Sequence, residues 1–102
     1  MIVLPAAELE AAEAALWYDD QRQGLGDEFL DELASAFEQI SKSPEQSPRF
    51  EHYAGGEEVR RYLMKRFPYL VVFVRRAQEL TVIAVCHARR RPDYWLERLK
   101  WN

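Results

Sequence analysis

The 102-residue chain, of which 48% is hydrophobic, is long enough for one domain with a buried core, and we expect a single domain over residues 1–102. A lone cysteine, Cys86, excludes an internal disulfide and suits a reducing compartment. No basic segment opens a secretory signal, and no apolar run approaches the roughly 20 residues that cross a bilayer. We therefore expect a cytoplasmic protein that does not bind a membrane.

The formal net charge of −3 hides an uneven distribution along the chain. Residues 1–58 carry a net charge of −11 and residues 59–102 a net charge of +8. Lysine and arginine are rarely buried without a partner. The division therefore predicts either a bipolar surface that steers a partner or mutual neutralisation of the two halves across the fold.

The N-terminal part has the period of two helices. After a short apolar start over residues 1–4, a first helix is predicted from Pro5 to near Gln21. Its expected apolar face is Ala6, Leu9, Ala12 and Leu16. A glycine-containing break at residues 24–26 precedes a second helix, which should begin near Asp27, end before Pro44 and form an antiparallel hairpin with the first. Its expected apolar face is Phe29, Leu33, Ala36, Phe37 and Ile40.

Beyond Pro44 the pattern changes to that of strands. Three β-rich segments cover residues 59–64, 69–74 and 80–86, and the last two are apolar on both faces, as in central strands. Short turns between them favour an antiparallel meander, with residues 75–79 as the second turn. Residues 93–100 can form one or two helical turns. The predicted fold is α+β: an N-terminal α-helical hairpin packed on a curved antiparallel β-sheet, with a short C-terminal helix.

The sequence HARRRPDYW, residues 87–95, follows the last predicted strand. A loop held by the end of a rigid sheet is a common place for functional residues. An antiparallel meander can bring the first strand and its turn to the same side as this loop. We therefore expect one basic patch beside His87, formed by Arg60, Arg61, Lys65, Arg66, Arg89, Arg90 and Arg91.

Three phrases, in this order, resemble the RelE/ParE family of toxins from bacterial type II toxin-antitoxin systems. They are AEAALWYDDQRQGLGDEFLDEL, VRRYLMKRFPYLVVF and IAVCHARRRPDYWLERL, and the resemblance extends from about Ala6 to Leu99. It is greatest for the ParE-like branch, in which a leucine-glycine turn, an RRFPY-type strand and an H-x-R-R-x-P-x-Y-W ending recur. The resemblance implies a growth-inhibiting toxin that a cognate antitoxin neutralises, with promoter DNA bound only through the antitoxin.

The resemblance leaves the target open. ParE-like members inhibit DNA gyrase, whereas RelE-like members cut mRNA on the ribosome by attack of a 2′-hydroxyl on the adjacent phosphate. A third reading is a homologue that still binds antitoxin but is no longer toxic. Proteins that dock on ribosomal RNA are usually strongly basic, and this chain is acidic. We therefore favour a non-enzymatic inhibitor of gyrase and keep the ribosome-dependent mRNA endoribonuclease as the alternative.

RNA cleavage would need a base, an acid and a cation beside the phosphate. His87 is the candidate base, although a histidine at a strand end often only orders its loop. In RNA-cutting relatives an arginine lies where this chain has Tyr69, so that cation is missing. The remaining candidates are Arg60, Arg61 or Arg66 as substitute cations and Glu57, Glu58 or Tyr94 as acids. We expect no cofactor, and no metal, because one cysteine with the distant His52 and His87 makes no ligand set.

The basic patch and the resemblance to toxins also predict which residues bind the target and the antitoxin. The expected target-binding residues are Arg60, Arg61, Arg66, Arg89, Arg90 and Arg91. The expected antitoxin-binding residues are Trp17, Tyr18, Leu25 and Phe50, apolar side chains that core packing could leave over. The alternatives are that the arginines are solvated or pair with carboxylates of the first helix, and that the aromatic pairs Trp17–Tyr18 and Tyr94–Trp95 belong to the core.

Overall fold

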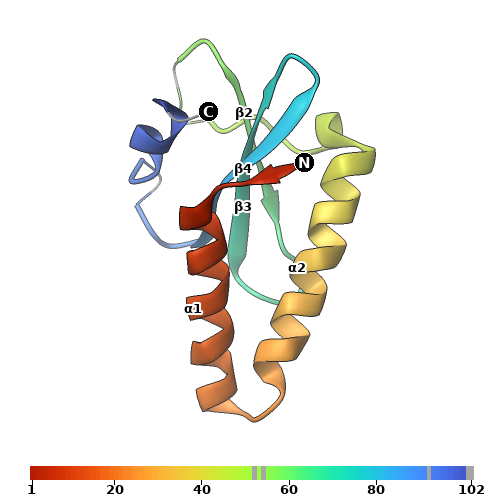
Figure 1. Ribbon diagram of the computed structural model, residues 1–102, viewed down its shortest axis with the longest axis vertical. Coiled ribbons are helices and arrows are strands. Elements are labelled where there is room, and N and C mark those ends of the chain that lie inside the picture. The colour runs from red at the N-terminus through yellow and green to blue at the C-terminus, as the bar shows by residue number, and fades with distance from the viewer. Residues whose placement is uncertain (52, 54, 92, 101–102) are drawn as a thin grey trace.

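The computed structural model describes residues 1–51, 53, 55–91 and 93–100. It confirms the α+β fold: two antiparallel helices pack on one face of a four-stranded sheet, and a short helix ends the described chain (Figure 1). The sheet order is β1-β4-β3-β2. In chain order the elements are β1 Ile2–Val3, α1 Pro5–Gln21, α2 Leu25–Lys42, the 3-10 helix η1 Pro44–Gln46, β2 Glu58–Leu63, β3 Tyr69–Arg76, β4 Glu79–His87 and the 3-10 helix η2 Leu96–Lys100.

The first strand was not expected. Ile2 and Val3 pair in parallel with Thr81 and Val82 of β4, so the sheet is mixed and not purely antiparallel. The apolar start thus covers an edge of β4 that would otherwise be open, and the amide of Leu4 continues the pairing to the carbonyl of Val82 at 3.1 Å. Such short edge strands carry too little local pattern to be recognised from sequence.

The predicted apolar face of the first helix is wrong. Leu9 and Leu16 are 60% and 68% exposed, whereas Ala7, Ala11 and Ala14 are buried. Both sets have helical spacing, but only the alanines are small enough for α1 to lie close to α2 and to the sheet. The leucines are consequently left on the solvent side of α1.

Two glycines at the helical hairpin have different roles. Gly24 has a left-handed φ of 90°, which glycine adopts without strain. Gly26 lies inside α2, where an added Cβ would be 2.4 Å from the carbonyl oxygen of Ala15. Its amide donates to the Asp19 carboxylate at 2.7 Å, so a side chain of α1 caps the first turn of α2. With this cap α2 begins at Leu25, two residues earlier than predicted.

The sheet is buried on both faces, as the apolar runs predicted for the last two strands. The helix-side face packs against both helices and contains Val71, Phe73, Val82 and Val85. The opposite face packs against Phe50 and the fully buried Trp95 of the C-terminal segment, and it contains Val59, Val72, Val74, Ile83 and Ala84. Two separate apolar cores therefore sandwich the central strands.

The predicted turn over residues 75–79 is too long. Arg75 and Arg76 continue β3 and pair with Leu80 and Glu79, which leaves a tight turn around Ala77. Both arginines reach carboxylates at the start of β2, and these ion pairs fasten the end of the hairpin.

Gly26→Ala should test the helix contact. The new methyl group would collide with the backbone of α1, so we expect the free energy of unfolding to fall by about 1–3 kcal/mol. Thermal unfolding should show a Tm lower by at least about 4 °C. Gly56→Ala is the control, because nothing lies within 4 Å of its added Cβ. An unchanged Tm for Gly26→Ala would contradict the close approach.

Candidate functional site

The carboxylate of Glu10 joins α1 to the sheet and to the C-terminal segment. It accepts hydrogen bonds from the Val85 amide at 3.0 Å, the Tyr94 hydroxyl at 2.6 Å and the Arg98 guanidinium at 2.9 Å and 3.1 Å. The Glu10 side chain is only 11% exposed. Four donors from two elements therefore converge on one nearly buried charge, which is the condition under which such a charge is stable.

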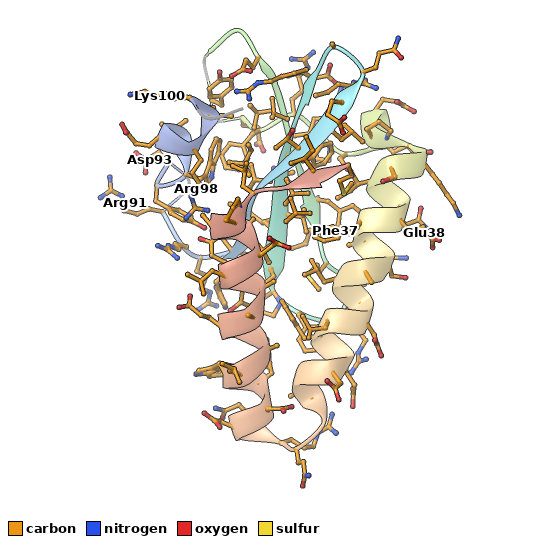
Figure 2. The ribbon with its side chains drawn as sticks, viewed as in Figure 1. Phe37, Glu38, Arg91, Asp93, Arg98 and Lys100 are labelled. Carbon is orange, nitrogen blue, oxygen red and sulfur yellow. The ribbon has the colours of Figure 1, made fainter. Side chains whose placement is uncertain are left out.

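Two residues of HARRRPDYW, Arg90 and Tyr94, stack beside this carboxylate together with Arg98. The Arg90 guanidinium lies 3.7 Å from the centre of the Tyr94 ring, and that of Arg98 lies 5.1 Å from it. Burial raises the pKa of the Tyr94 hydroxyl, and its hydrogen bond to Glu10 raises it further. Tyr94 is therefore a neutral donor fixed to α1. Figure 2 shows Arg98 beside the start of α1, whereas Arg91 and Lys100 extend away from the molecule.

His87 ends β4 on the helix-side face of the sheet. It follows the core residue Val85 by two positions, and its ring meets the Tyr69 ring edge-on at 5.4 Å. Its Nδ1 atom accepts a hydrogen bond from the Arg89 amide at 3.1 Å. The imidazole thus orders the start of the loop.

A cavity of about 480 Å³ lies on the opposite face of the sheet. Arg61 of β2 and the loop residues Arg89 and Arg90 line it, together with an apolar floor. The floor and walls include Phe50, Leu63, Leu70, Cys86 and Trp95. Burial raises the pKa of the Cys86 thiol to about 11, so this sulfur is not a nucleophile at neutral pH.

The structure does not bring the other predicted arginines to this cavity. Arg60 alternates with Arg61 along β2, so it lies on the helix side, where it donates to Glu58 at 2.8 Å and to the Ser47 carbonyl at 2.6 Å. Arg66 donates to Glu28 on α2 at 2.7 Å. Arg91 is 84% exposed and pairs with Asp93 at 3.5 Å. The prediction of a single basic patch is therefore wrong: its arginines are divided among four places.

Neutralisation between the two halves of the chain is extensive. Seven of the 11 basic side chains after residue 58 form ion pairs with carboxylates of residues 1–58: Arg60, Arg61, Arg66, Arg75, Arg76, Arg90 and Arg98. No such pair joins Lys65 or Arg89 to a carboxylate of the described residues. Ion pairs between the two halves of the chain therefore neutralise most of the basic residues of the second half.

Glu57 and Glu58, which were expected as possible acids, instead neutralise arginines through ion pairs. A hydrogen bond from Arg76 lowers the pKa of Glu57, and hydrogen bonds from Arg60 and Arg75 lower the pKa of Glu58. Both carboxyls are therefore ionised acceptors. Neither lines the cavity that holds Arg61 and Arg89.

The described helices include none that is long and apolar enough to cross a membrane. In the described part of the chain no group of three or more His, Cys, Asp or Glu side chains could hold a metal ion. His52 and Pro92, which enter the sequence arguments, lie outside the described residues.

A family model described as the ParE toxin of type II toxin-antitoxin system, parDE, matches residues 2–92. The chain belongs to this family. The match includes both α-helices, all four strands and the loop to Arg91, so it takes in the arginines of the cavity, whereas Tyr94 and Arg98, which bind Glu10, lie beyond it. A comparison with curated proteins gives no match. Membership of a type II toxin-antitoxin family implies a cognate antitoxin as partner.

The four residues of this ParE-family toxin that are expected to bind antitoxin differ in the solvent exposure of their side chains. Trp17 is 57% exposed on α1. Tyr18 stacks on Phe29 at 5.5 Å and packs against the helix-side core, as Leu25 does. Phe50 is buried against Trp95, with ring centres 5.0 Å apart. Of the four, only Trp17 is largely exposed to solvent. The role of all four residues in antitoxin binding remains a prediction.

Sequence reasoning missed Glu10 and Arg98 altogether. The available signal was spacing: Glu10 lies one turn from the buried positions 7 and 14 of α1, and Tyr94 and Arg98 are four residues apart. A carboxylate at the margin of an apolar stripe is usually solvated. Only the folded chain therefore shows that Glu10, Tyr94 and Arg98 are in contact.

Glu10→Gln should destabilise the protein. It removes the negative charge that compensates Arg98 and leaves an amide in place of an acceptor, so we expect the free energy of unfolding to fall by about 2–4 kcal/mol. Urea unfolding at neutral pH measures the change. Glu13→Gln, an exposed site on the same helix, is the control and should change stability by less than about 0.5 kcal/mol. Equal stability of the two variants would contradict the role of Glu10.

Glu58→Gln should alter the dependence of stability on pH. Because its pKa is lowered below 4.5 in the folded state, Glu58 stabilises the fold above that pH and loses this contribution as the pH falls through the folded value. We expect the variant to be less stable than the unmodified protein by about 1 kcal/mol at pH 7 and by a smaller amount at pH 3. Urea midpoints at both pH values test this, with the exposed Glu38→Gln as control. A constant difference would exclude the linkage.

Proposed function

We propose that this ParE-family toxin inhibits DNA gyrase by binding it, without catalysing a reaction, and that its cognate antitoxin neutralises it. One observation carries the non-enzymatic part. His87, the candidate base, lies on the helix-side face of the sheet, and the cavity with Arg61 and Arg89 lies on the other face. Although the two residues are neighbours at the end of β4, the His87 Nδ1 atom is already bonded to the Arg89 amide and its ring packs against Tyr69, an arrangement that does not favour a base and a cation around one ribose-phosphate.

The remaining catalytic candidates support the same view. The Tyr94 hydroxyl is committed to Glu10, and its raised pKa reduces its use as an acid or a base. Tyr69 stands where RNA-cutting relatives have an arginine, and its side chain packs against Phe29. RNA cleavage would need a base, an acid and a cation around one phosphate. The Tyr94 ring contacts Arg90, but among the described residues no side-chain contact joins either of them to the His87 ring, which packs against Tyr69.

Charge also favours a protein target. The chain is acidic in total, and most of its arginines are paired with its own carboxylates. Binding to ribosomal RNA normally draws on many unpaired cations that replace counterions of the phosphates. A protein surface needs only a few directional contacts, which Arg61, Arg89 and Arg90 can supply at one rim of the molecule.

For the antitoxin, we propose that part of it covers the solvent side of α1. Leu9, Leu16 and Trp17 are more than half exposed there, and Leu30 of α2 is 41% exposed. Carboxylates such as Glu13 and Asp20 lie around them. An amphipathic antitoxin helix with basic flanks fits such a surface. Promoter DNA would be bound through the antitoxin, since the toxin itself has few free cations.

The target can be tested with purified toxin in two assays, supercoiling by gyrase and mRNA cleavage on programmed ribosomes. We expect inhibition of supercoiling and no cleavage. Arg89 is the loop arginine that has no ion pair with a carboxylate of the described residues, and Arg89→Ala should weaken inhibition of supercoiling about tenfold. His87→Ala should leave inhibition within about twofold, provided that its Tm is unchanged.

Two results would replace the proposal. Cleavage of mRNA that disappears in His87→Ala would establish the endoribonuclease. Absence of activity in both assays, with normal growth of cells that express the chain without antitoxin, would establish a non-toxic antitoxin-binding homologue.

A further inference from the structure

The arginine cavity, which Arg61, Arg89 and Arg90 line, has the size of a small-molecule site. Its volume is about 480 Å³, and sites for small molecules are typically of about 300–1,000 Å³. If each water-sized group occupies about 30 Å³, the cavity can hold a ligand of about 10–15 non-hydrogen atoms. Its size therefore suits a small organic molecule better than a single inorganic ion.

The floor of the arginine cavity is apolar. Phe50, Cys86 and Trp95 are each at most 6% exposed there, and Leu63 and Leu70 extend the apolar lining. Because burial raises the pKa of the Cys86 thiol to about 11, this side chain is uncharged at neutral pH. Contact with such a lining favours apolar groups. A ligand for this cavity should therefore have an apolar body.

Trp95 adds a polar feature to this floor. Its indole N–H is buried and has no acceptor among the described residues. Buried donors are nearly always hydrogen-bonded in folded proteins, so this one is an exception. A ligand oxygen that reaches the indole N–H would supply the missing acceptor.

The charges at the rim favour a ligand with one negative charge. Glu51, the one carboxylate of the described lining, accepts from Nε of Arg61 at 3.1 Å and compensates that arginine. Glu10 lies 3.8 Å from Arg90 but also binds a second arginine, so it compensates Arg90 only in part. Arg89 forms no ion pair with a carboxylate of the described residues. A single carboxylate fits this balance, whereas Glu51 would repel the second charge of a phosphate.

We propose that the arginine cavity is a binding site for a small apolar monocarboxylate, such as an arylalkanoate or a medium-chain fatty acid. The carboxylate pairs with Arg89 at the rim, and the apolar body lies on the floor formed by Phe50, Leu70 and Trp95. This site goes beyond the proposed function and does not depend on it. A bound acid would cover Arg89, which is also among the residues proposed to contact gyrase.

The direct test is a titration of the full chain, labelled with ¹⁵N, with 4-phenylbutyrate, followed by NMR. We expect a Kd below about 1 mM, with shifts of the Arg89 amide and Trp95 indole resonances. The neutral 4-phenyl-1-butanol and the cationic 4-phenylbutylamine have the same apolar body and should bind at least about tenfold more weakly. A Kd above about 1 mM, equal affinities for the acid and the alcohol, or shifts confined to residues outside the cavity would overturn the proposal.

Three substitutions test the charge balance at the rim. Arg89→Ala should weaken binding of 4-phenylbutyrate about tenfold. Arg91→Ala is the matched control on the same loop and should change the affinity less than about twofold, because Arg91 is 84% exposed and is not part of the described lining. Glu51→Gln removes the carboxylate that compensates Arg61 and should strengthen binding at least about twofold. Thermal unfolding checks that each variant folds. Equal affinities for Arg89→Ala and Arg91→Ala, or no gain in Glu51→Gln, would refute the site.

A phosphate ester separates the two kinds of anion. 4-Phenylbutyl phosphate has the same apolar body as the acid but a more highly charged head, so we expect it to bind more weakly than 4-phenylbutyrate. Tighter binding of the ester would overturn the assignment to carboxylates. All these titrations use the toxin alone, so failure of the gyrase assay would leave this site intact, and failure of the titrations would leave the gyrase proposal intact.

Discussion

The arrangement of the molecule depends on one nearly buried carboxylate. Glu10 accepts from the backbone of β4 and from two side chains of the C-terminal segment, so the same charge fixes α1 on the sheet and holds the end of the chain against α1. A buried carboxylate is costly unless donors surround it, and Val85, Tyr94 and Arg98 supply these donors. The attachment is therefore specific as well as stabilising, since loss of the C-terminal segment would leave the Glu10 carboxylate with only the Val85 amide of these three donors.

The C-terminal segment in turn creates the second core. With Tyr94 fixed to α1, the neighbouring Trp95 enters the sheet face opposite the helices and meets Phe50 and Val74 there. This placement explains why β3 and β4 are apolar on both faces. It also accounts for two arginines of HARRRPDYW: Arg90 stacks on Tyr94, and Arg91 pairs locally with Asp93.

The distribution of charge connects this architecture to function. A fold that uses its carboxylates to neutralise its own arginines keeps few cations unpaired: at the rim of the arginine cavity, Arg61 and Arg90 have ion pairs with Glu51 and Glu10, and Arg89 has none with a carboxylate of the described residues. His87 ends β4 with its ring on the helix side of the sheet, against Tyr69. This arrangement supports the proposal that the site recognises a protein surface.

The sequence by itself determined the two helices, the three main strands and their antiparallel order, because apolar period and glycine or proline breaks are local signals. It also carried the family, since residues 2–92 match the ParE toxin model as the three phrases indicated. Only the tertiary structure decided which face of α1 is buried, where β1 pairs, and which arginines remain unpaired. Alanines and leucines at equal helical spacing compete for one interface, and closeness of packing selects between them. Neighbouring arginines such as Arg60 and Arg61 point to opposite faces of a strand, so their partners depend on what lies above and below the sheet. Those contacts join residues far apart in the chain, and no local pattern specifies them.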